Sequence, residues 1–154
     1  MLLIKKVGVY LNLTHFKFKT TVYNAFKYHN LDITPEQFLL IDSLWDVDAV
    51  SQQTIANFMH KDKNSITRLL DALERKNFIR RIADKDDRRN KLVQLTDKTR
   101  SLEGKITEVA TQAVEYITKN ISDKELDQFV STMIKMATNI DKYEEILKKE
   151  KYNG

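Results

Sequence analysis

The chain has 154 residues, the length of a single domain, and carries 26 Lys and Arg against 22 Asp and Glu, a formal net charge of +4. With 42% apolar and 31% charged residues, three Gly and one Pro, it is neither a disordered chain, a turn-rich β-sandwich nor a membrane bundle. The absence of cysteine excludes disulfides, thiolate nucleophiles and Cys-ligated zinc. No window approaches 18 uninterrupted apolar residues, so we expect a cytoplasmic, mostly helical protein that makes no membrane contact.

The positive charge is concentrated in one part of the chain. Residues 1–31 carry five Lys and no acidic residue, whereas residues 32–60 carry five acidic residues and no Lys or Arg. Residues 61–91 hold eleven basic and six acidic side chains, a local net charge of +5. A polyanionic partner would therefore be bound by this segment.

The N-terminal part of the chain predicts two helices. Ile4, Leu11 and Phe18 recur every seven positions, which indicates one long helix in the first thirty residues. Thr34-Pro35-Glu36-Gln37 then supplies an N-cap, a Pro at the first helical position and a capping-box Gln. The second helix is expected to run to about Trp45 and to be followed by a polar connection over residues 46–50.

The middle of the chain has the order of elements of a winged helix-turn-helix. Ser51 caps a short third helix, and Asp62 caps a fourth in which apolar residues recur at i, i+3, i+4 and i+7 from Ile66. Asn77 stands where the chain needs a left-handed residue. Two strand-like runs, residues 78–82 and 91–95, then enclose the charged segment ADKDDRRN, which predicts a hairpin.

The C-terminal part predicts two further helices. Thr96 caps the fifth, which has an apolar side and one weak point at Gly104. Ser122-Asp123-Lys124-Glu125 is a capping box that begins the sixth. The fold class is therefore mainly α with a small β-hairpin wing and long N- and C-terminal helices.

In a winged helix-turn-helix the second helix of the motif enters the major groove and the hairpin tip reaches the neighbouring groove. A guanidinium suits the narrow minor groove, and a neighbouring Asp can hold it while DNA is absent. The residues predicted to contact DNA come from the start of the third helix, the polar face of the fourth and the hairpin tip: Ser51, Gln52, Lys63, Asn64, Ser65, Thr67, Arg68, Asp87, Arg88 and Arg89.

The segment from Ser51 to Thr96 closely resembles the MarR family of bacterial transcription regulators. The resemblance rests on Thr67-Arg68-Leu69 and Leu73-Glu74 in the fourth helix, on Asp87-Arg88-Arg89 in the hairpin and on Leu95-Thr96. Asn77 and Thr99 stand where the family commonly has Gly.

The resemblance implies a homodimeric repressor or activator, of which we favour a repressor, that binds a palindromic operator in double-stranded DNA. Residues 34–95 would form the DNA-binding lobe, and residues 1–31 with 96–150 the helical dimerisation region. Arg89 would enter the minor groove, and Asp87 would orient an arginine of the wing.

The family commonly binds small-molecule effectors between its dimerisation helices and its DNA-binding lobe. The side chains of His15, Phe16, Tyr23 and Trp45 would suit a small aromatic or phenolic effector. The same side chains would equally be expected in core and dimer packing.

Two other interpretations are open. A winged-helix protein-interaction module without DNA affinity would keep the fold, and the salt dependence of binding separates it from a DNA-binding protein. An enzyme is disfavoured because the sequence has no phosphate-binding glycine loop, nucleophile elbow or metal-ligand spacing. We therefore expect no catalytic activity, no cofactor and no metal site.

Overall fold

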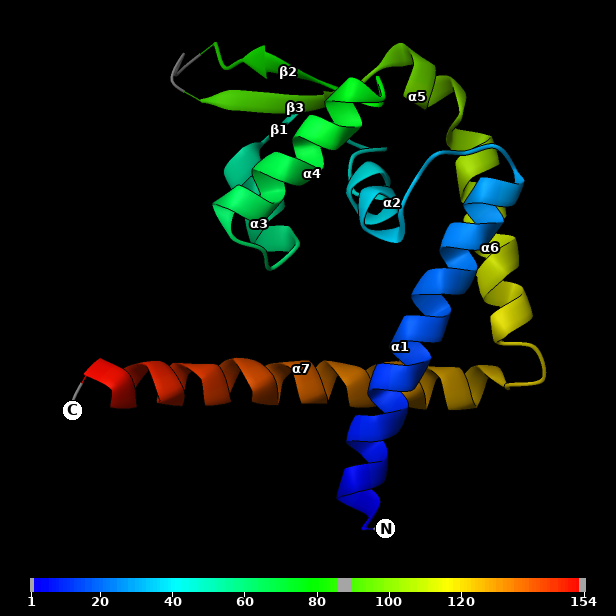
Figure 1. Cartoon of the computed structure of the whole chain (residues 1–154), viewed down its shortest axis with the longest axis vertical. Helices are drawn as coiled ribbons and strands as arrows, with labels where there is room; N and C mark the ends of the chain where they lie inside the picture. Colours follow the sequence, from blue (N-terminus) through cyan, green and yellow to red (C-terminus); the bar gives the residue numbers. More distant parts are fainter. Residues whose placement is uncertain (1, 86–89, 153–154) are drawn as a thin grey trace. The chain divides into compact units, whose positions relative to one another are not determined.

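The computed structural model describes residues 2–85 and 90–152 (Figure 1). Its contacts divide the chain into two compact units, one that ends at Ile117 and one that begins at Thr118. The elements of the first unit are α1 (Leu3–Tyr28), α2 (Pro35–Asp42), β1 (Val50–Ser51), α3 (Gln52–Phe58), α4 (Lys63–Arg75), β2 (Ile79–Ala83), β3 (Lys91–Leu95), α5 (Asp97–Ser101) and α6 (Glu103–Ile117). The second unit contains α7 (Asp123–Tyr152). The predicted fold class, mainly helical with a small β wing, is confirmed.

The predicted capping box at the start of α2 is present. The Thr34 hydroxyl accepts a 3.2 Å hydrogen bond from the Gln37 amide, and Oε1 of Gln37 accepts a 3.1 Å bond from the Thr34 amide. The helix ends at Asp42, earlier than the predicted end near Trp45. The Ser43 hydroxyl donates 2.8 Å to the Leu40 carbonyl, a local bond of the kind that competes with a continuing helix.

The sheet has one strand more than the sequence predicted. Its order is β1-β3-β2 and both pairings are antiparallel, with Val50 opposite Val93 and Arg81 also opposite Val93. The prediction of a polar connection up to Val50 was wrong at its end, because Val50 and Ser51 form β1. A strand of two residues is too short to show the alternation that identifies strands.

The helix predicted after Thr96 is divided into two. The Leu102 amide donates to the Thr99 carbonyl at 3.0 Å, a three-residue bond that closes α5, and α6 begins at Glu103. The break lies two positions before Gly104, the predicted weak point.

The core joins helices from both ends of the first unit. The α1 helix lies beside α6, and α4 packs against β2 (Figure 1). Fully buried side chains come from α1, α2, α4, the sheet and α6, and include Phe26, Leu40, Ile41, Leu70, Leu73, Val93, Leu95 and Ile106. This core fixes the start of α4 and the wing, defined here as β2 and β3, relative to α1.

The second unit is a helix on which most of the large apolar side chains are exposed within the chain. Its predicted capping box is present, because Oε2 of Glu125 accepts 2.9 Å from the Ser122 amide and the Ser122 hydroxyl accepts 3.4 Å from the Glu125 amide. Phe129 is 58% exposed and Ile140 54% exposed. None of the helices in the described part of the chain is both long and apolar enough to cross a membrane.

Candidate nucleic-acid interface

The first turn of α4 is held by its N-cap, Asp62. Oδ1 accepts hydrogen bonds from the amides of Asn64 at 2.9 Å and Ser65 at 3.0 Å, and Oδ2 accepts 2.6 Å from the Ser65 hydroxyl. These bonds, that from the Ser65 hydroxyl first, lower the pKa of Asp62. The cap uses the hydroxyl proton of Ser65, one of the predicted DNA contacts, while its neighbour Asn64 stays exposed.

Four of the predicted contacts form an exposed face on α4. Lys63, Asn64, Thr67 and Arg68 are all exposed, and the Thr67 hydroxyl donates 2.8 Å to the Lys63 carbonyl. Their spacing of three and four residues places them on neighbouring turns of one helix. The structure therefore assembles donors and positive charge at the N-terminal end of α4, where a groove-binding helix needs them.

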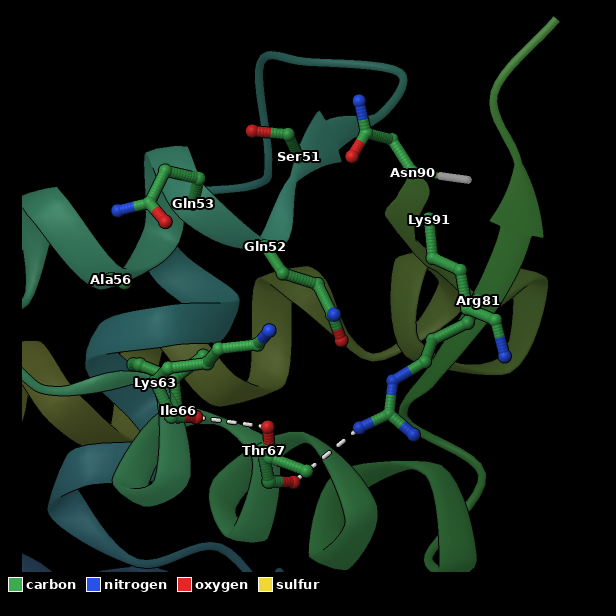
Figure 2. Close-up of a pocket in the computed structure, with 10 residues that line it drawn as sticks. All are labelled: Ser51, Gln52, Gln53, Ala56, Lys63, Ile66, Thr67, Arg81, Asn90 and Lys91. Carbon is green, nitrogen blue, oxygen red and sulfur yellow. Dashed lines mark hydrogen bonds between the residues drawn. The ribbon is translucent and has the colours of Figure 1, made fainter. Parts of the chain in front are cut away.

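The predicted contacts at the start of α3 lie across a hollow from α4. Ser51 caps α3, accepting a 3.0 Å bond from the Thr54 amide, and Ser51 and Gln52 are partly buried. The hollow has a volume of about 500 Å³, and Figure 2 shows its lining drawn from α3, α4 and the sheet. The residues that line it are Ser51, Gln52, Gln53, Ala56, Lys63, Ile66, Thr67, Arg81, Asn90 and Lys91.

The sequence did not single out Gln53, Asn90 or Lys91 as contact residues. Lys91 is exposed at the first position of β3, opposite Ala83. The sequence feature that could have indicated Lys91 is its position directly after the charged loop of the hairpin. Where the two strands meet the hairpin loop, the Asp84 amide donates 3.2 Å to the Asn90 carbonyl. The predicted wing contacts Asp87, Arg88 and Arg89 lie outside the described residues.

Ion pairs connect α2 with α1 and with the turn between α3 and α4. A further ion pair connects the end of α4 with the segment that follows α1. Oε1 of Glu36 lies 3.3 Å from Nζ of Lys19 and 3.6 Å from Nζ of Lys61. Burial raises the pKa of Glu36, but the hydrogen bond and charge of Lys19, together with Lys61, lower it by more. Nζ of Lys76 lies 3.0 Å from Oδ1 of Asp32.

The predicted effector residues do not converge on one cavity. Tyr23 lines a hollow of about 330 Å³ together with Lys27, Asn30, Leu31 and Asp32, and the other three predicted residues are not in its lining. His15 and Phe16 are exposed on α1, while Trp45 is partly buried against the core. Among the described residues, no three His, Asp or Glu side chains gather as a metal site would require.

A short capped helix, a tight turn, a second helix with an exposed polar face and an antiparallel wing define a winged helix-turn-helix protein. Residues 33–91 match the model of the MarR family. This segment therefore carries the domain that defines the MarR family of transcription regulators. The comparison with curated protein sequences found no match.

Solved structures share this fold over most of the chain. A MarR transcriptional regulator from Methanosarcina mazei has a TM-score of 0.75 at 20% identity, covering 90% of this chain and 98% of that one. The S. aureus MepR–DNA complex has a TM-score of 0.77 at 24% identity, covering 86% and 96%. A mutant MarR from E. coli, complexed with operator DNA, has a TM-score of 0.75 at 21% identity, covering 88% and 99%.

Proposed function

We propose that this chain is a sequence-specific DNA-binding regulator that acts as a homodimeric repressor on a palindromic operator. The observation that carries the proposal is the exposed face of α4, on which Lys63, Asn64, Thr67 and Arg68 stand beside a capped N-terminus. The DNA complexes of MepR and of the E. coli MarR support it, because both proteins share this fold.

Each residue of this face has chemistry suited to a different part of a duplex. The amide of Asn64 can pair with an adenine edge and the guanidinium of Arg68 with a guanine edge. Lys63 is suited to a phosphate, where it adds affinity without reading sequence. Asp87, Arg88 and Arg89 are proposed to bring the wing to the adjacent minor groove, where focused negative potential favours arginine.

The proposed dimer follows from apolar surface that one chain leaves exposed. On α1 the exposed side chains include Ile4 and Phe16, and on α7 they include Phe129 and Ile140. Extended apolar surface of this kind marks an interface. A two-fold dimer would place the two α4 helices in successive major grooves, about 34 Å apart, which requires a palindromic site.

We also propose that a small aromatic or phenolic effector modulates the dimer. The support is the hollow beside Tyr23, at the C-terminal end of α1 next to the chain that leads into α2. His15, Phe16 and Trp45 remain the other proposed effector residues. An effector that binds one spacing of the two α4 helices better than another would shift the population of DNA-competent dimers.

The proposal is tested by selecting bound duplexes from a random-sequence pool with the full chain, then measuring fluorescence anisotropy. We expect the recovered duplex to be palindromic and bound at least about a thousandfold more tightly than a scrambled duplex of equal length. Equal affinity for both duplexes would contradict sequence-specific regulation. Failure to bind either one would favour a winged-helix protein-interaction module.

A further inference from the structure

The geometry points to Arg81 as a positioning residue that fixes the wing against α4 through Asp71 and Glu74 and does not itself contact DNA. This inference rests on the proposed function, since it concerns how two DNA-binding elements are held at one angle. The chain offers two neighbouring arginines on β2, Arg80 and Arg81, and the structure uses them differently.

The guanidinium of Arg81 is bonded to both acidic side chains on the adjacent face of α4. Its Nη2 lies 2.7 Å from Oδ1 of Asp71, and its Nη1 lies 2.9 Å from Oε2 of Glu74. Nη2 also donates 3.4 Å to the carbonyl of Thr67, as Figure 2 shows. Only 15% of the Arg81 side chain is exposed. The two carboxylates are themselves 47% and 40% exposed, so what distinguishes the pairs is that one largely buried guanidinium is held in a fixed direction by bonds to both.

The main chain of the wing is attached to the same acid. β2 is an edge strand, because the sheet order is β1-β3-β2. An edge strand leaves amide donors without a strand partner. Oε1 of Glu74 accepts a 3.1 Å bond from the Arg81 amide. Glu74 therefore binds both the backbone and the side chain of one strand residue, which fixes the position and the rotation of β2 on α4.

Charge balance explains why the guanidinium is directed toward α4. Asp71 and Glu74 are three residues apart on the helix, a spacing at which two negative charges repel. Arg81 lies between them and neutralises this repulsion. A phosphate would have to compete with two carboxylates already in contact, so Arg81 is poorly placed to add a phosphate contact. The consequence is a rigid connection between α4 and the wing.

Arg80 provides the matched control. Arg80 is exposed, and its Nε donates a 2.9 Å hydrogen bond to Oε1 of Gln94 on β3 and not to a residue of α4. We expect Arg81→Lys, which keeps the charge but loses the forked geometry, to reduce the preference for the selected duplex over the scrambled duplex about tenfold. Arg80→Lys should leave that preference unchanged.

The salt dependence of binding separates positioning from contact. If Arg81 only positions the wing, the slope of log K against log salt is the same in Arg81→Gln as in Glu74→Gln, which removes one charged partner of Arg81 on α4 and keeps the arginine. A slope that is smaller by about 0.9 in Arg81→Gln than in Glu74→Gln would show a direct phosphate contact and overturn the inference. Wild-type preference in both Arg81 variants would also overturn it, while leaving the proposed function intact.

A second variant covers the case in which Arg81 variants fail to fold. Glu74→Gln keeps the shape of the side chain, and we expect it to reproduce the loss of preference; in the double variant with Arg81→Lys the two losses should not add. Hydrogen exchange tests the connection without DNA. The Arg81 amide should exchange faster in Glu74→Met, which has no side-chain oxygen to accept its hydrogen bond, than in the wild type. Unchanged exchange would contradict the inference even if no duplex is bound.

Discussion

The hydroxyl of Thr99 donates a 2.6 Å hydrogen bond to the carbonyl of Phe78, and both residues are buried. The same carbonyl accepts 3.1 Å from the Thr96 amide, and the Thr96 hydroxyl donates 2.8 Å to the carbonyl of Asn77. The start of α5 is thereby tied to the turn that connects α4 with the wing. A glycine at position 99, which the MarR resemblance would favour, has no hydroxyl to make this bond.

Replacing Thr99 with Val should lower the free energy of unfolding by about 1–2 kcal/mol, because the shape is kept while a buried hydrogen bond is lost. Urea denaturation measures the change. Thr107→Val, at an exposed position of α6, is the control and should change stability by less than about 0.5 kcal/mol. Equal stability of wild type and Thr99→Val would show that the bond adds nothing.

Replacing His60 with Gly should stabilise the fold. His60 lies in the turn between α3 and α4 with φ of 49°, a left-handed conformation that is costly for a side chain without local hydrogen bonding. We expect the free energy of unfolding to rise by about 0.5–1 kcal/mol. This gain is the backbone strain that glycine relieves, reduced by the conformational entropy that glycine adds to the unfolded chain. Asn77→Gly, at φ of 58°, should gain less, because Asn tolerates this conformation. A larger gain at Asn77 would refute this account of the turn.

Stability should fall in acid partly through Asp62. Its pKa in the folded chain is below the ordinary value of 3.8, so its contribution is present above that value and is lost as pH falls through the lower folded pKa. Asp62→Asn keeps an N-cap oxygen without the titration. The thermal midpoint should fall further between about pH 6 and about pH 3 in the wild type than in Asp62→Asn. Parallel curves would remove Asp62 from the explanation.

A charge on the apolar face of α7 should prevent the proposed dimerisation. Ile140 is 54% exposed within the chain, and burying a carboxylate in its place would be costly. We expect Ile140→Glu to sediment as a monomer at concentrations at which the wild type is a dimer. Thr138→Glu adds the same charge at an exposed position on the opposite side of the helix and should remain dimeric. Monomeric wild-type protein would refute the dimer.

Local signals in the sequence predicted the caps, whereas a tertiary contact decided the strand that the sequence did not predict. Thr34 and Asp62 cap their helices through partners two or three residues away, and such spacing is visible in a single sequence. β1 exists because Val50 pairs with Val93, far along the chain, and no local pattern indicates that pairing.

The same distinction between local signals and tertiary contacts applies to the candidate nucleic-acid interface. The exposed face of α4 follows from helical periodicity, so Lys63 and Arg68 could be predicted. The position of Arg81 between Asp71 and Glu74 could not, because it depends on how the sheet packs on the helix. A charged residue in a charged hairpin gives no sign that its partners lie on another element.

The salt dependence of binding to the selected duplex tests the claim that the exposed face of α4 binds duplex DNA. We predict that log K falls linearly with log salt, and that Lys63→Gln reduces the slope by about 0.9, the value for one phosphate contact. Lys105→Gln, exposed on α6, should keep the wild-type slope. Wild-type binding that does not change with salt, or a Lys63→Gln slope equal to that of the wild type, would contradict the claim.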